Sequence, residues 1–164
     1  MFHGHLVSAQ AEAEKAVERF SREDEWVWRF RLLKADILLR RGFSEDVLTL
    51  LAPQLPQSIS DGDLAAKRYT LQGLAYTRLG RLPEADAVLS QAERLCQLPN
   101  STMSGEVATA RGVLEMHRGS LQEAGDSFRK SLGFARQQHD GFLQAAALLN
   151  LGVAAMRKIG RAHV

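Results

Sequence analysis

The six residues GRLPEA at positions 80–85 set the pattern for the whole chain. The phrase returns as GSLQEA at 119–124 and as GHLVSA at 4–9, and GFSEDV at 42–47 keeps its spacing. The leading glycines, Gly4, Gly42, Gly80 and Gly119, are 38 or 39 residues apart. A fixed period of this length is typical of stacked repeat architectures. The pattern therefore favours an extended binding surface over a catalytic pocket.

Apolar residues recur at helical spacing through nearly all of the chain, so we predict an all-α fold. Glycine and proline interrupt this pattern at short intervals and divide it into helices. The predicted helices are 6–20, 24–41, 44–51, 61–79, 83–97, 104–118, 121–138 and 142–158. Long helices joined by short turns indicate antiparallel helix pairs.

Three further columns of residues keep register with the glycines. Small residues stand seven positions before the glycine, where they would let a partner helix approach closely: Ala35, Gly73 and Gly112. Apolar residues stand nine positions after it: Ala13, Leu51, Leu89 and Phe128. The third column stands sixteen positions after it: Phe20, Ser58, Cys96 and Ala135. Such columns are what a core built between neighbouring repeats requires.

The order Tyr69…Gly73…Tyr76…Gly80…Ala85…Leu89…Ala92 follows the tetratricopeptide repeat signature, and residues 112–128 and 148–152 follow it in part. The chain resembles that family over nearly its whole length, with a longer period than the standard unit of about 34 residues. Longer-period arrays of this kind occur in bacterial ATPase-type transcription activators and before caspase-like peptidase domains. The resemblance implies a right-handed α-solenoid of antiparallel helical hairpins with a concave groove.

The register makes residues 1–158 one repeat array, with units at about 1–22, 23–60, 61–103, 104–140 and a partial unit at 141–158. The first and last units each lack one helix, so we expect the array to belong to a longer protein. The tail 159–164, IGRAHV, matches a common sequencing-library adapter translated in one frame. Our hypothesis is that this tail is not native, and the alternative is an ordinary polar helix end.

In tetratricopeptide arrays the first helix of each pair lines the groove, which implies a set of partner-binding positions here. They are Arg40, Lys67, Thr70, Leu74, Arg78, Thr109, Val113, His117 and Arg157. Four of them, Arg40, Arg78, His117 and Arg157, would form a basic ladder along the groove and bind an acidic peptide through charge-assisted hydrogen bonds. Alternatively, they only complement the dipole at the end of each helix.

The bulk composition narrows the class of partner. A formal net charge of +2 gives no basic face for nucleic acid, and no apolar run approaches the ~18 residues that span a membrane. The N-terminus has no signal-peptide pattern, and a single cysteine fits a reducing compartment. We therefore expect a cytoplasmic protein that binds a protein or peptide, neither nucleic acid nor membrane, and that self-associates through exposed repeat ends.

The sequence indicates no catalytic, metal or cofactor site, so the chain is not expected to be an enzyme. Cys96 stands in an apolar column, which favours a core role over that of a nucleophile with His117 or His139 as base. The histidines lack zinc-site spacing, and no glycine-rich phosphate loop is present. Core packing is the expected role of the aromatic run at 26–30, with a partner-facing role for Trp28 as the alternative.

Two functional hypotheses follow. The first is an interaction or scaffold module that binds a peptide or protein partner in the concave groove. The alternative is a regulatory array of a larger signalling protein, a transcription activator or a caspase-like peptidase, whose effector domain lies outside these residues.

Overall fold

The computed structural model describes residues 3–19, 24–56, 59, 62–97 and 101–162. The regular secondary structure in these residues is entirely helical, which confirms the expected all-α class. The helices are α1 (His3–Arg19), α2 (Asp24–Arg40), α3 (Ser44–Leu50), α4 (Gly62–Arg78), α5 (Leu82–Leu95), α6 (Ser104–Arg118), α7 (Leu121–Gln137) and α8 (Gly141–Ala162). Each predicted helix is present, with its ends within four residues of the prediction.

Three glycine turns share one geometry. Gly42, Gly80 and Gly119 have φ angles of 90°, 73° and 82°, a region that glycine adopts without strain. In each turn the residue after the glycine donates its N–H to the carbonyl five residues earlier, as Ser120 does to Glu115 at 2.9 Å. This bond satisfies the carbonyl end of the preceding helix. The recurring glycine therefore ends the first helix of each pair and turns the chain back.

The two ends of the chain depart from the predicted boundaries. α1 begins at His3, so Gly4 lies inside a helix and the prediction of a turn at this glycine was wrong. At the other end, α8 continues past residue 158 to Ala162, while 163–164 lie outside the described residues. The non-native origin of the tail stays a hypothesis.

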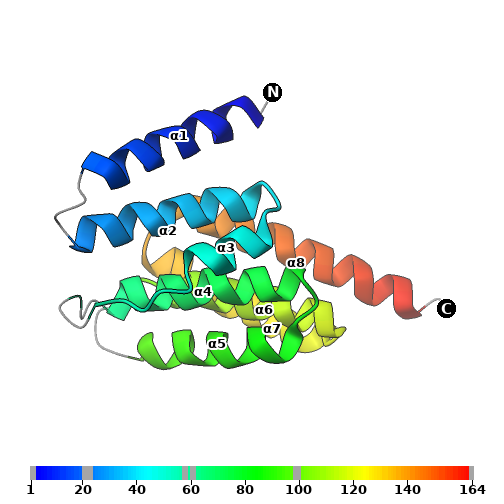
Figure 1. Ribbon diagram of the computed structural model, residues 1–164. Coiled ribbons are helices and arrows are strands. Elements are labelled where there is room, and N and C mark those ends of the chain that lie inside the picture. The colour runs from blue at the N-terminus through cyan, green and yellow to red at the C-terminus, as the bar shows by residue number, and fades with distance from the viewer. Residues whose placement is uncertain (1–2, 20–23, 57–58, 60–61, 98–100, 163–164) are drawn as a thin grey trace.

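The helices contact their near neighbours in chain order. α4 packs against α2, α3, α5 and α6, and α6 packs against α4, α5, α7 and α8. Within the described residues, no helix backbone approaches one more than two positions away in this order. Figure 1 shows the result, with α1 at one edge of the molecule, α2 and α3 next to it, and α4 beyond them.

Gly73 and Gly112 each accept a side chain from the helix that follows. A Cβ atom built on Gly112 would lie 2.5 Å from Cε1 of Phe128, and one built on Gly73 would lie 2.5 Å from Cγ of Leu89. Leu89 and Phe128 are fully buried at these contacts. The other described members of the first two columns are buried as well: Ala13, Ala35 and Leu51. The packing role predicted for both columns is confirmed.

The aromatic residues of α2 divide between core and surface. Trp28 is 4% exposed and lies in a cluster that spans α2, α3 and α4. Trp26 is 46% exposed and stacks on Phe30, with ring centroids 5.9 Å apart. The expectation of core packing is therefore right for Trp28 and wrong for Trp26, which lies in the first turn of α2 with nearly half of its surface exposed.

Arg111 joins α5 to α6 through a network of charged hydrogen bonds. Its guanidinium binds both oxygens of Glu93, at 2.8 and 2.9 Å, and also binds Asp86 and Ser90. Arg118 contacts the second oxygen of Asp86 at 3.1 Å. The hydrogen bond from Arg111, supported by Arg118, holds the pKa of Asp86 below its ordinary value despite partial burial of the carboxyl.

Replacing glycine with alanine should have opposite effects on stability at Gly112 and at Gly152. Gly112→Ala should lower the free energy of unfolding by about 1–3 kcal/mol, because the new methyl group would overlap the buried ring of Phe128. Gly152→Ala should raise it by about 0.5–1 kcal/mol, because nothing lies within 4 Å of the new Cβ and alanine is the better helix former. Denaturant unfolding measures both, and a neutral Gly112→Ala would contradict the close contact.

The Asp86 network predicts a pH dependence of stability. Because the pKa of Asp86 is lower in the folded than in the unfolded state, its ion pairs stabilise the protein above the ordinary aspartate range. That contribution is lost as the pH falls through this range and below it. Between about pH 6 and pH 3, the free energy of unfolding of Asp86→Asn should therefore fall less steeply than that of the wild type. If the free energy of unfolding fell equally steeply with pH in both proteins, the lowered pKa of Asp86 in the folded state would be contradicted.

Candidate functional site

The first helices of successive pairs enclose a cavity of about 410 Å³. We call this cavity the groove, and α2, α4, α6 and α8 line it. Its apolar lining is Leu71, Leu74, Ala110, Phe142, Leu143 and Ala146, and its polar lining is Asp36, Arg40, Lys67, Thr70, Glu106, Thr109 and Asp140. An apolar cavity with a few placed polar groups is the usual form of a binding site.

The charged residues of the groove pair with one another. Arg40 Nε lies 3.0 Å from Asp36 Oδ2 on α2, and Lys67 of α4 forms an ion pair with Glu106 of α6. Asp140 accepts the N–H of Leu143 at 2.9 Å and so caps α8. The lining thus has two cations and three carboxylates. Its charge alone does not select an acidic ligand.

The groove threonines are bonded inside the protein. The Thr70 hydroxyl donates to the carbonyl of Ala66 at 2.7 Å. The Thr109 hydroxyl lies 2.7 Å from that of Ser131, which is fully buried on α7. The Thr109–Ser131 bond therefore joins α6 to α7, whereas the Thr70 bond lies within α4.

The nine predicted partner-binding residues fall into two groups. Five line the groove together: Arg40, Lys67, Thr70, Leu74 and Thr109. The other four do not line it: Arg78, Val113, His117 and Arg157. Arg78 donates a hydrogen bond to the carbonyl of Leu39 near the end of α2, and Val113 packs against the cluster that contains Phe128. His117 and Arg157 are exposed. Of the predicted basic ladder Arg40, Arg78, His117 and Arg157, only Arg40 therefore lines this cavity.

The start of α8 supplies groove residues that the sequence pattern did not indicate. Phe142 is 73% exposed, and the Arg40 guanidinium lies 6.0 Å from its ring centroid. Leu143 and Ala146 lie on the same side of α8 and also line the cavity. The contact joins α2 to α8 through side chains although their backbones are not neighbours. It depends on the curvature of the helix stack, which no repeat column encodes.

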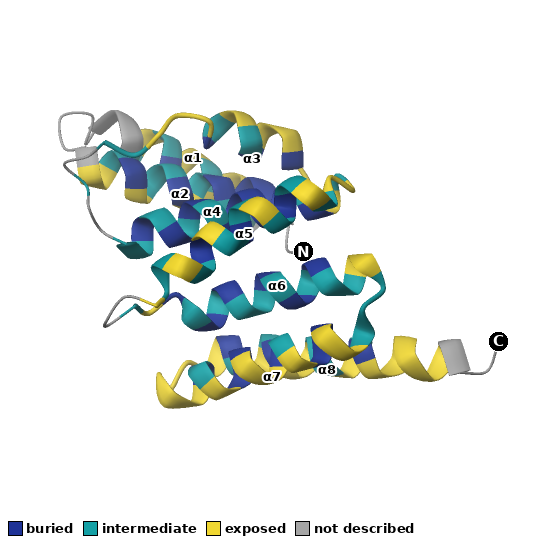
Figure 2. Cartoon of the chain, turned by 90° about the horizontal axis from the view of Figure 1, so that it is seen from below, coloured by how far each residue is buried: buried dark blue, intermediate teal, exposed yellow. Residues whose placement is uncertain are grey.

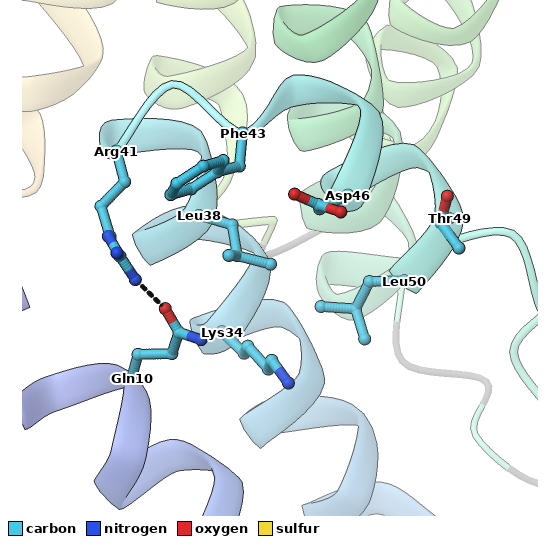
Figure 3. Close-up of a pocket in the computed structure, with 8 residues that line it drawn as sticks. All are labelled: Gln10, Lys34, Leu38, Arg41, Phe43, Asp46, Thr49 and Leu50. Atoms are coloured by element: carbon cyan, nitrogen blue, oxygen red, sulfur yellow. Dashed lines mark hydrogen bonds between the residues drawn. The ribbon is translucent and has the colours of Figure 1, made fainter. Parts of the chain in front are cut away.

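A second cavity, of about 500 Å³, lies between α1, α2 and α3 (Figure 3). Gln10 of α1 and Arg41 at the end of α2 meet across it through a hydrogen bond. Lys34, which also lines it, forms an ion pair with Glu14 of α1 at 2.8 Å. α3 has only seven residues, so it covers little of the space beside α1. We interpret this cavity as a gap between helices of unequal length.

Cys96 is half-buried at the end of α5. It packs against a cluster of Ala66, Ala92, Met103 and Val107, and burial raises the pKa of its thiol. A raised pKa disfavours the thiolate that nucleophilic catalysis needs. The column partner Ala135 is fully buried, while Phe20 and Ser58 lie outside the described residues. In the part of the chain that the structure describes, no three His, Cys, Asp or Glu side chains gather as a metal site requires.

α8 is the most apolar helix of the described chain. Residues Gly141–Gly160 reach a mean hydropathy of 1.2 and are long enough to cross a membrane, so the expectation that no apolar run approaches this length was wrong. Core helices of soluble proteins, which are mostly buried, pass the same test of length and composition, whereas 17% of this window is buried here. In this structure one face of α8, with Leu143, Ala147 and Ala154, is buried against the preceding helices.

No known protein family and no curated protein matches the sequence. Among solved structures, the chain is similar to the crystal structure of BtubC (BKLC) from P. vanneervenii. The two share 20% sequence identity with a TM-score of 0.64, over 91% of this chain and 65% of that chain. The chain therefore spans about two thirds of the length of BtubC, and at this identity the likeness establishes a shared helical fold alone.

The Thr109–Ser131 hydrogen bond predicts a structural cost at a groove position. Thr109→Val keeps the shape of the side chain but leaves the buried Ser131 hydroxyl without this partner, which should lower the free energy of unfolding by about 1–2 kcal/mol. The control Thr49→Val removes an exposed hydroxyl that donates to the Glu45 carbonyl and should change stability little. Equal effects of the two variants in thermal unfolding would show that Thr109 has no such role.

Proposed function

We propose that the chain is a non-catalytic protein-interaction module, a right-handed solenoid of tetratricopeptide-like hairpins that binds a peptide in the groove. The observation that carries the proposal is that one apolar cavity receives side chains from α2, α4, α6 and α8, each the first helix of a hairpin. Three glycine turns of equal geometry and contacts confined to near neighbours support the solenoid arrangement.

The chemistry of the groove defines the kind of peptide that fits. Phe142, which is 73% exposed, and the half-buried Leu74 and Ala146 offer an apolar surface for one or two large side chains of the ligand. The pairs Arg40–Asp36 and Lys67–Glu106 lie beside this surface and offer both donors and acceptors. A peptide with an apolar anchor flanked by polar residues therefore suits the groove better than a uniformly acidic one.

A peptide library displayed on phage tests the proposal. Peptides selected on the wild-type protein should lose binding to Ala146→Trp, because the indole would fill the cavity from α8. They should keep binding to Ala87→Trp, which places the same side chain at an exposed site on α5 outside the groove. Thermal unfolding confirms that both variants are folded. Selected peptides that bind both variants equally would contradict the groove as the binding site.

A further inference from the structure

Pairs of small residues mark the face on which each first helix receives its partner helix. The pairs are Ala66 and Gly73 on α4, Gly105 and Gly112 on α6, and Ala145 and Gly152 on α8. On α6 both members approach α7: a Cβ on Gly112 would lie 2.5 Å from Phe128, and one on Gly105 would lie 3.3 Å from Cβ of Phe134, although its nearest neighbour, at 2.6 Å, is Leu143 of α8.

The same face of α8 is open. Nothing lies within 4 Å of a Cβ built on Gly152, although its counterparts Gly73 and Gly112 are each filled by a buried side chain. The register is secure because Ala147 and Ala154 of α8 are buried, as are Val107 and Leu114 at the equivalent positions of α6. α8 therefore repeats the receiving surface of α6 without an occupant in the described structure.

Large apolar side chains surround the open glycine. Leu148, Leu149 and Met156 are 54%, 70% and 66% exposed, and they share one side of α8 with Ala145 and Gly152. Figure 2 shows the exposed residues continuing along α8 where it extends beyond the other helices. An apolar surface of this kind marks an interaction site.

We infer that this face of α8 binds one amphipathic helix, antiparallel to α8, which inserts a large apolar side chain at Gly152. The interface would continue the one already formed between α6 and α7, where Phe128 fills Gly112. The charge of α8 specifies a second property of the partner. α8 has no acidic residue and carries Arg157 and Lys158 in its C-terminal half, where the first turn of an antiparallel helix would lie. Acidic residues in that turn would complement both charges and the partner's own helix dipole.

A second copy of this chain does not offer such a helix. α5 and α7 have acidic first turns and the required apolar residues Leu89 and Phe128, but both are packed in their own hairpins. α1 carries only Ala13 at the corresponding position and has no acid in its first turn. The partner helix is therefore a segment other than residues 3–162. The inference concerns a different surface from the groove and does not depend on the proposed function.

The probe for this surface is a labelled synthetic peptide with the sequence of residues 119–138, which contains the α7 helix and Phe128. Fluorescence anisotropy should show that it binds the whole protein, and the Phe128→Ala peptide should bind about tenfold more weakly or worse. Gly152→Leu should abolish binding, because the leucine occupies the space meant for the phenylalanine. The matched control Gly133→Leu makes the same change at another open helical glycine and should bind the peptide as the wild type does.

Three results would overturn the inference. One is no binding at about 1 mM peptide, which sets the affinity below that of a specific contact. Another is equal binding by Gly152→Leu and Gly133→Leu, which would mean that the peptide exchanges with α7 or binds elsewhere. The third is light scattering that shows a dimer dissociated by Gly152→Leu, which would make a second copy the occupant. Because the site at Gly152 is open, Gly152→Leu should unfold no earlier than the wild type.

Discussion

The close approach of each first helix to its partner depends on having almost no side chain at the crossing point. At Gly112 the ring of Phe128 stands where a methyl group would be, and at Gly73 the side chain of Leu89 does the same. Packing at this distance lets the two helices share a buried core without a gap. It also fixes their relative rotation, because only one register places the large side chain over the glycine. The polar contacts between the helices, such as those of Arg111, then form at the edges of an interface that is already set.

The groove is a consequence of this register. Thr70 and Thr109 each lie three positions before the crossing glycine, at the edge of the same helix face, and from there they line the cavity. Repeating the unit places these surfaces beside one another, so four helices that are distant in sequence line one cavity. On α8, one face lines the groove, whereas the face around Gly152 has no helix packed on it in the described structure.

The fold was largely predictable because the information that sets it is local and repeated. The turn glycines, the small column and the apolar column could each be compared across units, and the structure gives Gly42, Gly80 and Gly119 one conformation. The prediction of a turn at Gly4 was wrong because matching spacing does not show whether a helix precedes the glycine. The groove was predictable only in part. Lys67 and Thr109 follow from the register, whereas Phe142 reaches Arg40 through the curvature of the whole stack. Arg78 does not line this cavity, and its guanidinium donates to the Leu39 carbonyl of a neighbouring helix, a contact that the sequence does not reveal.

The most direct test of the account is a double-mutant cycle between Gly73 and Leu89. Gly73→Ala alone should destabilise the protein, because its methyl group meets the Leu89 side chain at 2.5 Å. In a Leu89→Ala background the same methyl group enters the space that the leucine has left, so Gly73→Ala should become neutral or stabilising. The account predicts a coupling free energy of about 1 kcal/mol or more between the two sites. Additive effects within about 0.3 kcal/mol would show that the two residues do not share a contact, and would contradict the packing on which the rest of the structure depends.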